Sequence, residues 1–190
     1  MISAFEYVTV LISIILGLGI TQILTAIADL IHQSKRVKIY WPHLLWVLIV
    51  LILHVQEWWV TYDLKNYAPW RLPTFLFIMV YPIILFVLAR LLFPFGIQNG
   101  IIDLKVFYHE NHRKIFLFSI GLGLLAILDS LLIRGDSLQS QLLKGIVPLT
   151  FSTLYFIKSP EWVHKSVAVS FFLLLIVTIA VQWNEWLISN

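Results

Sequence analysis

Apolar residues fall into six long runs along the chain, and short polar stretches separate these runs. A helix needs about 20 mostly apolar residues to cross a hydrocarbon core about 30 Å thick. Five runs meet this length, whereas Lys144, Gly145 and Pro148 interrupt the fifth in chain order. The pattern predicts an all-α, polytopic membrane helix bundle without a soluble domain. One integral membrane domain would cover residues 1–190, with six transmembrane helices near 7–31, 42–62, 72–93, 115–133, 138–157 and 164–188.

Local features refine these six predicted helices. The first run is expected to be retained, because Glu6 stands where a cleavable signal peptide carries basic residues. Pro82 and Pro148 lie inside the third and fifth runs, and each is expected to kink its helix. The longest connection, residues 95–114, mixes apolar and charged positions. We expect it on the cytoplasmic side, with a short helix lying in the membrane interface.

Composition agrees with a lipid environment. Hydrophobic residues make up 60% of the 190 residues and charged residues 12%, against about 45–50% and 25% in soluble domains. The net charge is +3, but the basic residues lie in short connections, which favours contact with anionic lipid over nucleic acid. The absence of cysteine excludes disulfides, thiolate metal sites and a cysteine nucleophile.

Basic residues are unevenly distributed between the two sides that six spans define. One side carries nine and the other four, whereas omitting the fifth span would give seven against six. Because cytoplasmic loops are enriched in Lys and Arg, the bias predicts that both termini lie outside. The nine are Lys35, Arg36, Lys38, Arg90, Lys105, Arg113, Lys114, Lys158 and Lys165, and the four are Lys65, Arg71, Arg134 and Lys144.

Several short motifs carry a resemblance to a known family. They are Leu16-Gly17-Leu18-Gly19, Tyr40-Trp41-Pro42-His43-Leu44-Leu45-Trp46, Trp58-Trp59, Tyr81-Pro82 and Leu92-Phe93-Pro94. With these motifs the chain resembles a family of small multi-span bacterial inner-membrane proteins that has no assigned activity. The resemblance covers the first three runs well and the rest loosely. It implies a bacterial inner-membrane setting and no particular function.

The second run carries the most informative polar residues. His43, His54, Glu57 and Thr61 are separated by 11, 3 and 4 residues, so on a helix they fall within about 60° of one another. A carboxylate in the outer half of a bilayer is costly and should face the protein interior or a cavity. The functional interpretation is a group that handles protons or cations. The alternative is a hydrogen bond to a neighbouring helix.

Other polar residues are predicted at a similar depth in the outer half. If they converge, the carboxylates outnumber Lys144 and the pocket would prefer cations. The alternative is that Lys144 and Glu185 simply reach the headgroups. The candidate ion or solute path consists of His54, Glu57, Asp129, Lys144, Gln182 and Glu185.

A smaller polar set lies in the inner half. Gln22, Thr25 and Asp29 form a stripe on the first helix, and Arg90 lies near the inner end of the third. We expect a structural role, with Asp29 pairing with Arg90 near the membrane edge.

Two helices carry seams of small residues, Ser13-Gly17-Thr21 and Ser119-Gly123-Ala126. Such seams allow helices to approach closely, so packing is their expected role. The Gly-x-Gly pieces within them are 104 residues apart, which would fit an inverted repeat. A 22 kDa bundle of this kind is also expected to form a homo-oligomer.

The sequence gives no sign of catalysis, a metal or a cofactor. His109, Glu110 and His112 lie in the 95–114 connection without further ligands nearby in sequence, and only His54 is deep enough for a bis-histidine haem. Hydrolase, metalloprotease and nucleotide-binding motifs are missing.

Two function classes remain. One is a channel or transporter for a cation, proton or small solute, and the other is a non-enzymatic membrane subunit for assembly, sensing or signalling, with a protein partner left open. A cavity lined by Glu57 and Asp129 would favour the first class, and a dry core would favour the second.

Overall fold

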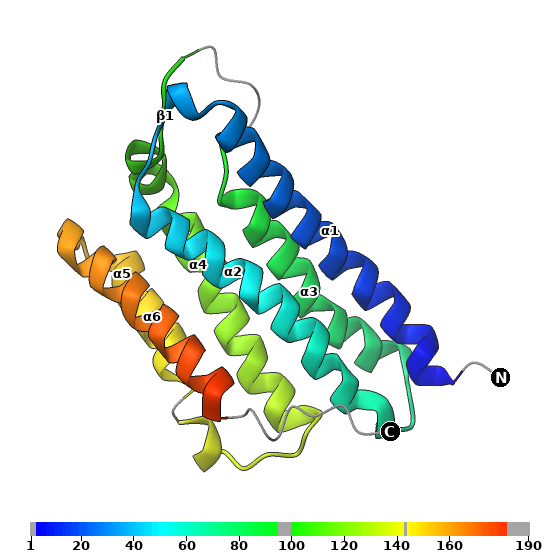
Figure 1. Ribbon diagram of the computed structural model, residues 1–190. Coiled ribbons are helices and arrows are strands. Elements are labelled where there is room, and N and C mark those ends of the chain that lie inside the picture. Colours follow the sequence, from blue (N-terminus) through cyan, green and yellow to red (C-terminus); the bar gives the residue numbers. More distant parts are fainter. Residues whose placement is uncertain (1–2, 95–99, 143, 182–190) are drawn as a thin grey trace.

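Five helices are long and apolar enough to cross a membrane in the computed structural model, which describes residues 3–94, 100–142 and 144–181. The fold is therefore all-α and compatible with a multi-pass membrane bundle (Figure 1). A shorter apolar helix lies between the fourth and fifth long ones. The helices are α1 (Ala4–His32), α2 (Trp41–Val60), α3 (Leu72–Leu91), α4 (Leu104–Leu132), α5 (Ile146–Phe156) and α6 (Glu161–Val181).

Helix starts follow from local sequence chemistry. Ser3 and Glu6 form a capping box at α1, with Ser3 N donating to Glu6 Oε2 at 2.7 Å and Glu6 N donating to Ser3 Oγ at 3.1 Å. The Asp103 carboxylate caps α4 by accepting from two backbone N–H groups. Pro42 and Pro73 lie in the first turns of α2 and α3, where a missing N–H leaves no bond unmade.

The helices lie side by side in one bundle (Figure 1). α1 packs against α2 and α3, α3 against α4, α4 against α5, and α2 against α6. At the end of the bundle where α1 finishes and α4 begins, β1 (Val37–Lys38) and β2 (Ile102–Asp103) form a short parallel pair. Short 3₁₀ turns, η1 (Ser34–Arg36), η2 (Thr61–Asn66) and η3 (Gln139–Gln141), complete the connections.

The start of α4 differs from the sequence prediction. The helix begins at Leu104 rather than near residue 115, so residues 104–114 are its first turns and not a separate interfacial helix. The cause is the Asp103 cap, which nucleates the helix ahead of the apolar run. At 29 residues, α4 is about 44 Å long and extends past a 30 Å hydrocarbon core.

The fifth predicted helix is shorter than expected. α5 has 11 residues and is about 16 Å long, roughly half of a hydrocarbon core. Pro148 lies in its first turn, so the kink predicted there is absent: a proline that close to a helix start removes no intrahelical bond. Pro82, in contrast, lies inside α3 as predicted and is buried.

α4 and α6 begin at the same end of the bundle. Lys105 Nζ lies 2.7 Å from Glu161 Oε2, and the Tyr108 hydroxyl lies 3.1 Å from His164 Nδ1. Figure 1 shows the two helices running in the same direction. Residues 133–160 therefore carry the chain back from the end of α4 to the start of α6.

Two glycines lie where neighbouring helices leave no room for a side chain. A side chain at Gly19 would collide with the buried His54 ring of α2, and a Cβ at Gly123 would lie 2.9 Å from Pro148 Cδ of α5. Gly17 has nothing within 4 Å of a Cβ position. The seam on α4 thus packs against α5, whereas the seam around Gly17 lies open on α1.

Candidate functional site

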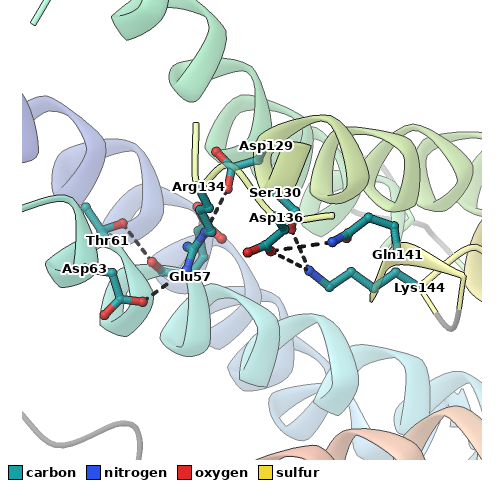
Figure 2. Close-up of polar contacts among 9 residues, drawn as sticks. All are labelled: Glu57, Thr61, Asp63, Asp129, Ser130, Arg134, Asp136, Gln141 and Lys144. Atoms are coloured by element: carbon teal, nitrogen blue, oxygen red, sulfur yellow. Dashed lines mark hydrogen bonds and ion pairs between the residues drawn. The ribbon is translucent and has the colours of Figure 1, made fainter. Parts of the chain in front are cut away.

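A cavity of about 420 Å³ lies at the end of the bundle where α2 and α4 finish. Polar side chains converge on it from several elements, and Figure 2 shows most of them. Its polar lining comprises Gln56, Glu57, Thr61, Tyr81, Asp129, Ser130, Arg134, Asp136, Lys144 and Thr178. The start of α1 lies at the same end, because the Phe5 and Tyr62 rings are 6.2 Å apart. We call this the outer end, after the predicted orientation.

Glu57 enters the cavity from the last turn of α2. Its backbone carbonyl accepts a hydrogen bond from Thr61 Oγ1 at 2.8 Å, which tightens the end of the helix. Among the described residues, no side chain forms a hydrogen bond or ion pair with its carboxylate. A half-buried carboxylate without a side-chain partner is a costly group to keep, which marks it as available for a ligand.

Arg134 joins two carboxylates at the rim of the cavity. Its Nη1 lies 3.2 Å from Asp63 Oδ2 and its Nε 3.2 Å from Asp129 Oδ2. Burial acts to lower the pKa of this guanidinium, but the hydrogen bonds and charges of Asp129 and Asp63 outweigh burial and raise the pKa. Arg134 is therefore a permanent cation whose charge is already matched.

The end of α4 places Arg134 there, with Arg134 N donating to Asp129 O at 3.3 Å, and a glycine turn then places Asp136. α4 ends at Leu132, and Gly135 adopts a φ of 71°, a left-handed conformation that suits glycine. Asp136 N then donates to Ser130 O at 2.9 Å, which closes the turn. The chain thus folds back over its own helix end and brings Arg134 and Asp136 to the cavity.

Lys144 approaches from the segment before α5. Its Nζ donates to Ser130 Oγ at 2.5 Å and lies 4.0 Å from Asp136 Oδ2. Gln141 Nε2 contacts the same carboxylate oxygen at 3.5 Å. Among the described residues, three carboxylates and two cations line the cavity, so this part of the lining has an excess of negative charge when all are ionised.

A second cavity of about 240 Å³ adjoins the first. Most of its lining is apolar and aromatic, including Trp46, Leu88, Phe151 and Phe171. The two cavities share five lining residues, which form the junction between them: Gln56, Tyr81, Ala126, Lys144 and Thr178.

The structure brings together three residues of the predicted path, Glu57, Asp129 and Lys144. His54 lies elsewhere, packed against Gly19 of α1 with its Nδ1 2.7 Å from Val50 O. Three residues along a helix rotate a side chain by about 60°, and this rotation suffices to point His54 and Glu57 at different helices. Gln182 and Glu185 lie outside the described residues.

Sequence reasoning missed several members of the site. Arg134, Asp136 and Tyr81 were not among the predicted path residues, although all three line the cavity. Gly135 after a long apolar run was the available signal, since glycine commonly ends a helix and reverses the chain. Nothing in the spacing indicated that Arg134 would also lie 3.2 Å from Asp63.

The inner-half set is more dispersed. Thr25 and Asp29 are exposed on α1, and Gln22 and Arg90 are partly buried. The pairing of Asp29 with Arg90 stays a prediction.

Histidines gather at the inner end, where α4 and α6 begin. The rings of His109, His112 and His164 have centroids 5.0–6.2 Å apart. Within the described part of the chain, no group of three or more His, Asp or Glu side chains is arranged to hold a metal ion.

No family model, curated protein or solved structure matches this chain. The family resemblance of the first three runs therefore stays an expectation. The helices themselves support the class, a multi-pass α-helical membrane protein.

Proposed function

We propose that this protein moves a cation, proton or small solute across the membrane, and that Glu57 is the group on which passage depends. The observation that carries the proposal is the cavity of about 420 Å³ lined by Glu57 and Asp129. A subunit with a purely structural role has no need of a charged cavity inside an apolar bundle.

Electrostatics support a positively charged cargo. Arg134 is matched by Asp63 and Asp129, and Lys144 lies near Asp136. The carboxylate of Glu57 has no such partner among the described residues. Two unit charges 4 Å apart interact by about 4 kcal/mol at an effective dielectric constant of 20, so an entering cation would find its strongest new contact at Glu57.

The test is flux in liposomes that contain the wild type, Glu57→Gln or the control Glu6→Gln. Glu57→Gln keeps the shape and removes the charge, so proton or monovalent-cation flux should fall about tenfold or more. Glu6 is exposed at the same end of the bundle, and glutamine can still complete its capping box. Glu6→Gln should therefore conduct like the wild type.

Equal flux in wild type and Glu57→Gln, with both above empty liposomes, would remove Glu57 from the mechanism. Flux at the level of empty liposomes for every variant would instead favour the non-enzymatic subunit.

We also propose six crossings with both termini outside. The return of the chain through residues 133–160 supports an even number, and the nine-to-four bias of basic residues supports the orientation. Because the protein has no cysteine, single cysteines at positions 2 and 189 can be labelled selectively. Both should react with an impermeant maleimide in intact spheroplasts. Protection of one terminus alone would contradict six crossings.

We also propose that the protein forms a homo-oligomer in a bacterial inner membrane. It is supported by the open seam on α1, where Gly17 has free space and Thr21 is exposed. Light scattering corrected for detergent should give a mass of at least two 22 kDa chains. A monomeric mass in several detergents would count against it.

A further inference from the structure

We propose that the cargo is an organic cation with an apolar body, bound with its charge near Glu57 and its body in the aromatic cavity beneath. This inference rests on the proposed function and specifies its substrate class. It is motivated by the two cavities, which share five lining residues although one is lined by charges and the other by apolar side chains.

The charged end of the ligand is assigned by the carboxylates. Tyr81 lines both cavities, and Glu57 lines the charged cavity beside it. A cation at this junction would approach Glu57, the one carboxylate in the described lining that no described side chain satisfies. Arg134 would not repel it strongly, because Asp63 and Asp129 already balance its charge at 3.2 Å.

The apolar end is assigned by aromatic rings. Trp46, Phe151 and Phe171 line the aromatic cavity, with ring centroids 4.7–6.0 Å apart. Such faces bind apolar groups and also attract cations. With about 420 and 240 Å³, the joined space lies in the size range of small-molecule sites, about 300–1,000 Å³. An inorganic cation would leave the aromatic part unused.

The alternative ligand is an amphipathic anion, whose charge Lys144 would bind. Its side chain lines both cavities. However, its Nζ already donates to Ser130 Oγ and lies near Asp136. An anion would have to displace these contacts and approach the excess carboxylates, so the structure favours the cation.

The test measures binding without transport, by calorimetry on protein in lipid nanodiscs with the heat of empty nanodiscs subtracted. Three probes share one shape: phenylbutyl-trimethylammonium, its neutral isostere with carbon in place of nitrogen, and phenylbutylsulfonate. The wild type should bind the cation about tenfold or more tightly than the neutral compound. Glu57→Gln should abolish this preference, and Glu6→Gln should keep it.

A second substitution tests binding of the ligand's apolar body separately from binding of its charged group. Ser119 lines the aromatic cavity and not the charged one, so Ser119→Leu should weaken binding of the phenylbutyl cation about tenfold and leave tetramethylammonium binding unchanged. Val147→Phe fills the same aromatic cavity from α5 and should act alike if Ser119→Leu does not fold.

Preference for the sulfonate, equal binding of the cation and its neutral isostere, or cation binding unchanged by Glu57→Gln would each overturn this inference. Flux that depends on Glu57 without binding of the organic cation would refute this substrate class and leave the proposed function standing. Selective binding without flux would refute transport and leave the ligand assignment.

Discussion

The two ends of the bundle carry matching ion-pair triplets of opposite charge. At the outer end, Arg134 lies between Asp63 and Asp129 (Figure 2). At the inner end, Glu161 lies between Lys105 and Lys165, at 2.7 and 2.8 Å. The two ends differ in what lies behind each triplet, because the outer one borders a charged cavity and the inner one borders packed rings.

The inner end is filled by aromatic and histidine side chains. Tyr108 and His43 are fully buried, and the Tyr108 hydroxyl contacts His164 Nδ1 at 3.1 Å. Phe116 stacks on His164 with 5.9 Å between centroids and 14° between planes. His43 meets Tyr108 edge to face at 6.2 Å. Ion-pair triplets of opposite charge therefore mark two different interiors, one suited to anchoring helices and the other to receiving a ligand.

The largest expected effect is a loss of stability when the buried ring of Phe116 at the inner end is removed. Phe116 is fully buried against His164, Trp46 and Phe151. Phe116→Ala should lower the free energy of unfolding by about 3–5 kcal/mol through lost contacts and a cavity, measured by denaturant titration in mixed micelles. Flux per folded molecule should be unchanged, because Phe116 lines neither cavity.

Phe156→Ala is the control for this change, since that ring is 77% exposed. It should alter stability by less than about 0.5 kcal/mol. A comparable loss in both variants would mean that the inner rings do not hold the bundle together.

A smaller effect is expected at the outer triplet. Arg134→Gln leaves Asp63 and Asp129 facing each other without a cation. The three side chains are 30–52% exposed, so solvent screening limits the expected loss to about 1 kcal/mol. The loss should shrink as salt is raised from low to physiological concentration.

Glu161→Gln provides the matched change at the inner end. Lys105 and Lys165 are flexible cations that can turn toward lipid phosphates, so this variant should lose less stability than Arg134→Gln. An equal or greater loss, measured in the same titration, would show that the two triplets are not distinguished by their surroundings.

Sequence alone determined the class of this protein and the positions of most helices. Long apolar runs leave lipid as the plausible surroundings, and prolines and capping residues mark helix ends within a few residues. It also predicted a similar depth for Glu57, Asp129 and Lys144 from their positions in the predicted spans, and all three line one cavity.

Only the tertiary structure decided which polar groups meet. Helical periodicity placed His54 and Glu57 on one face, but the direction of each neighbouring helix separated them, with Gly19 making room for His54. The end of α4 brought Arg134 to Asp63, 71 residues away in sequence, and packing left α5 as a short helix against Gly123. These outcomes depend on contacts between residues far apart in sequence, which a one-dimensional pattern does not contain.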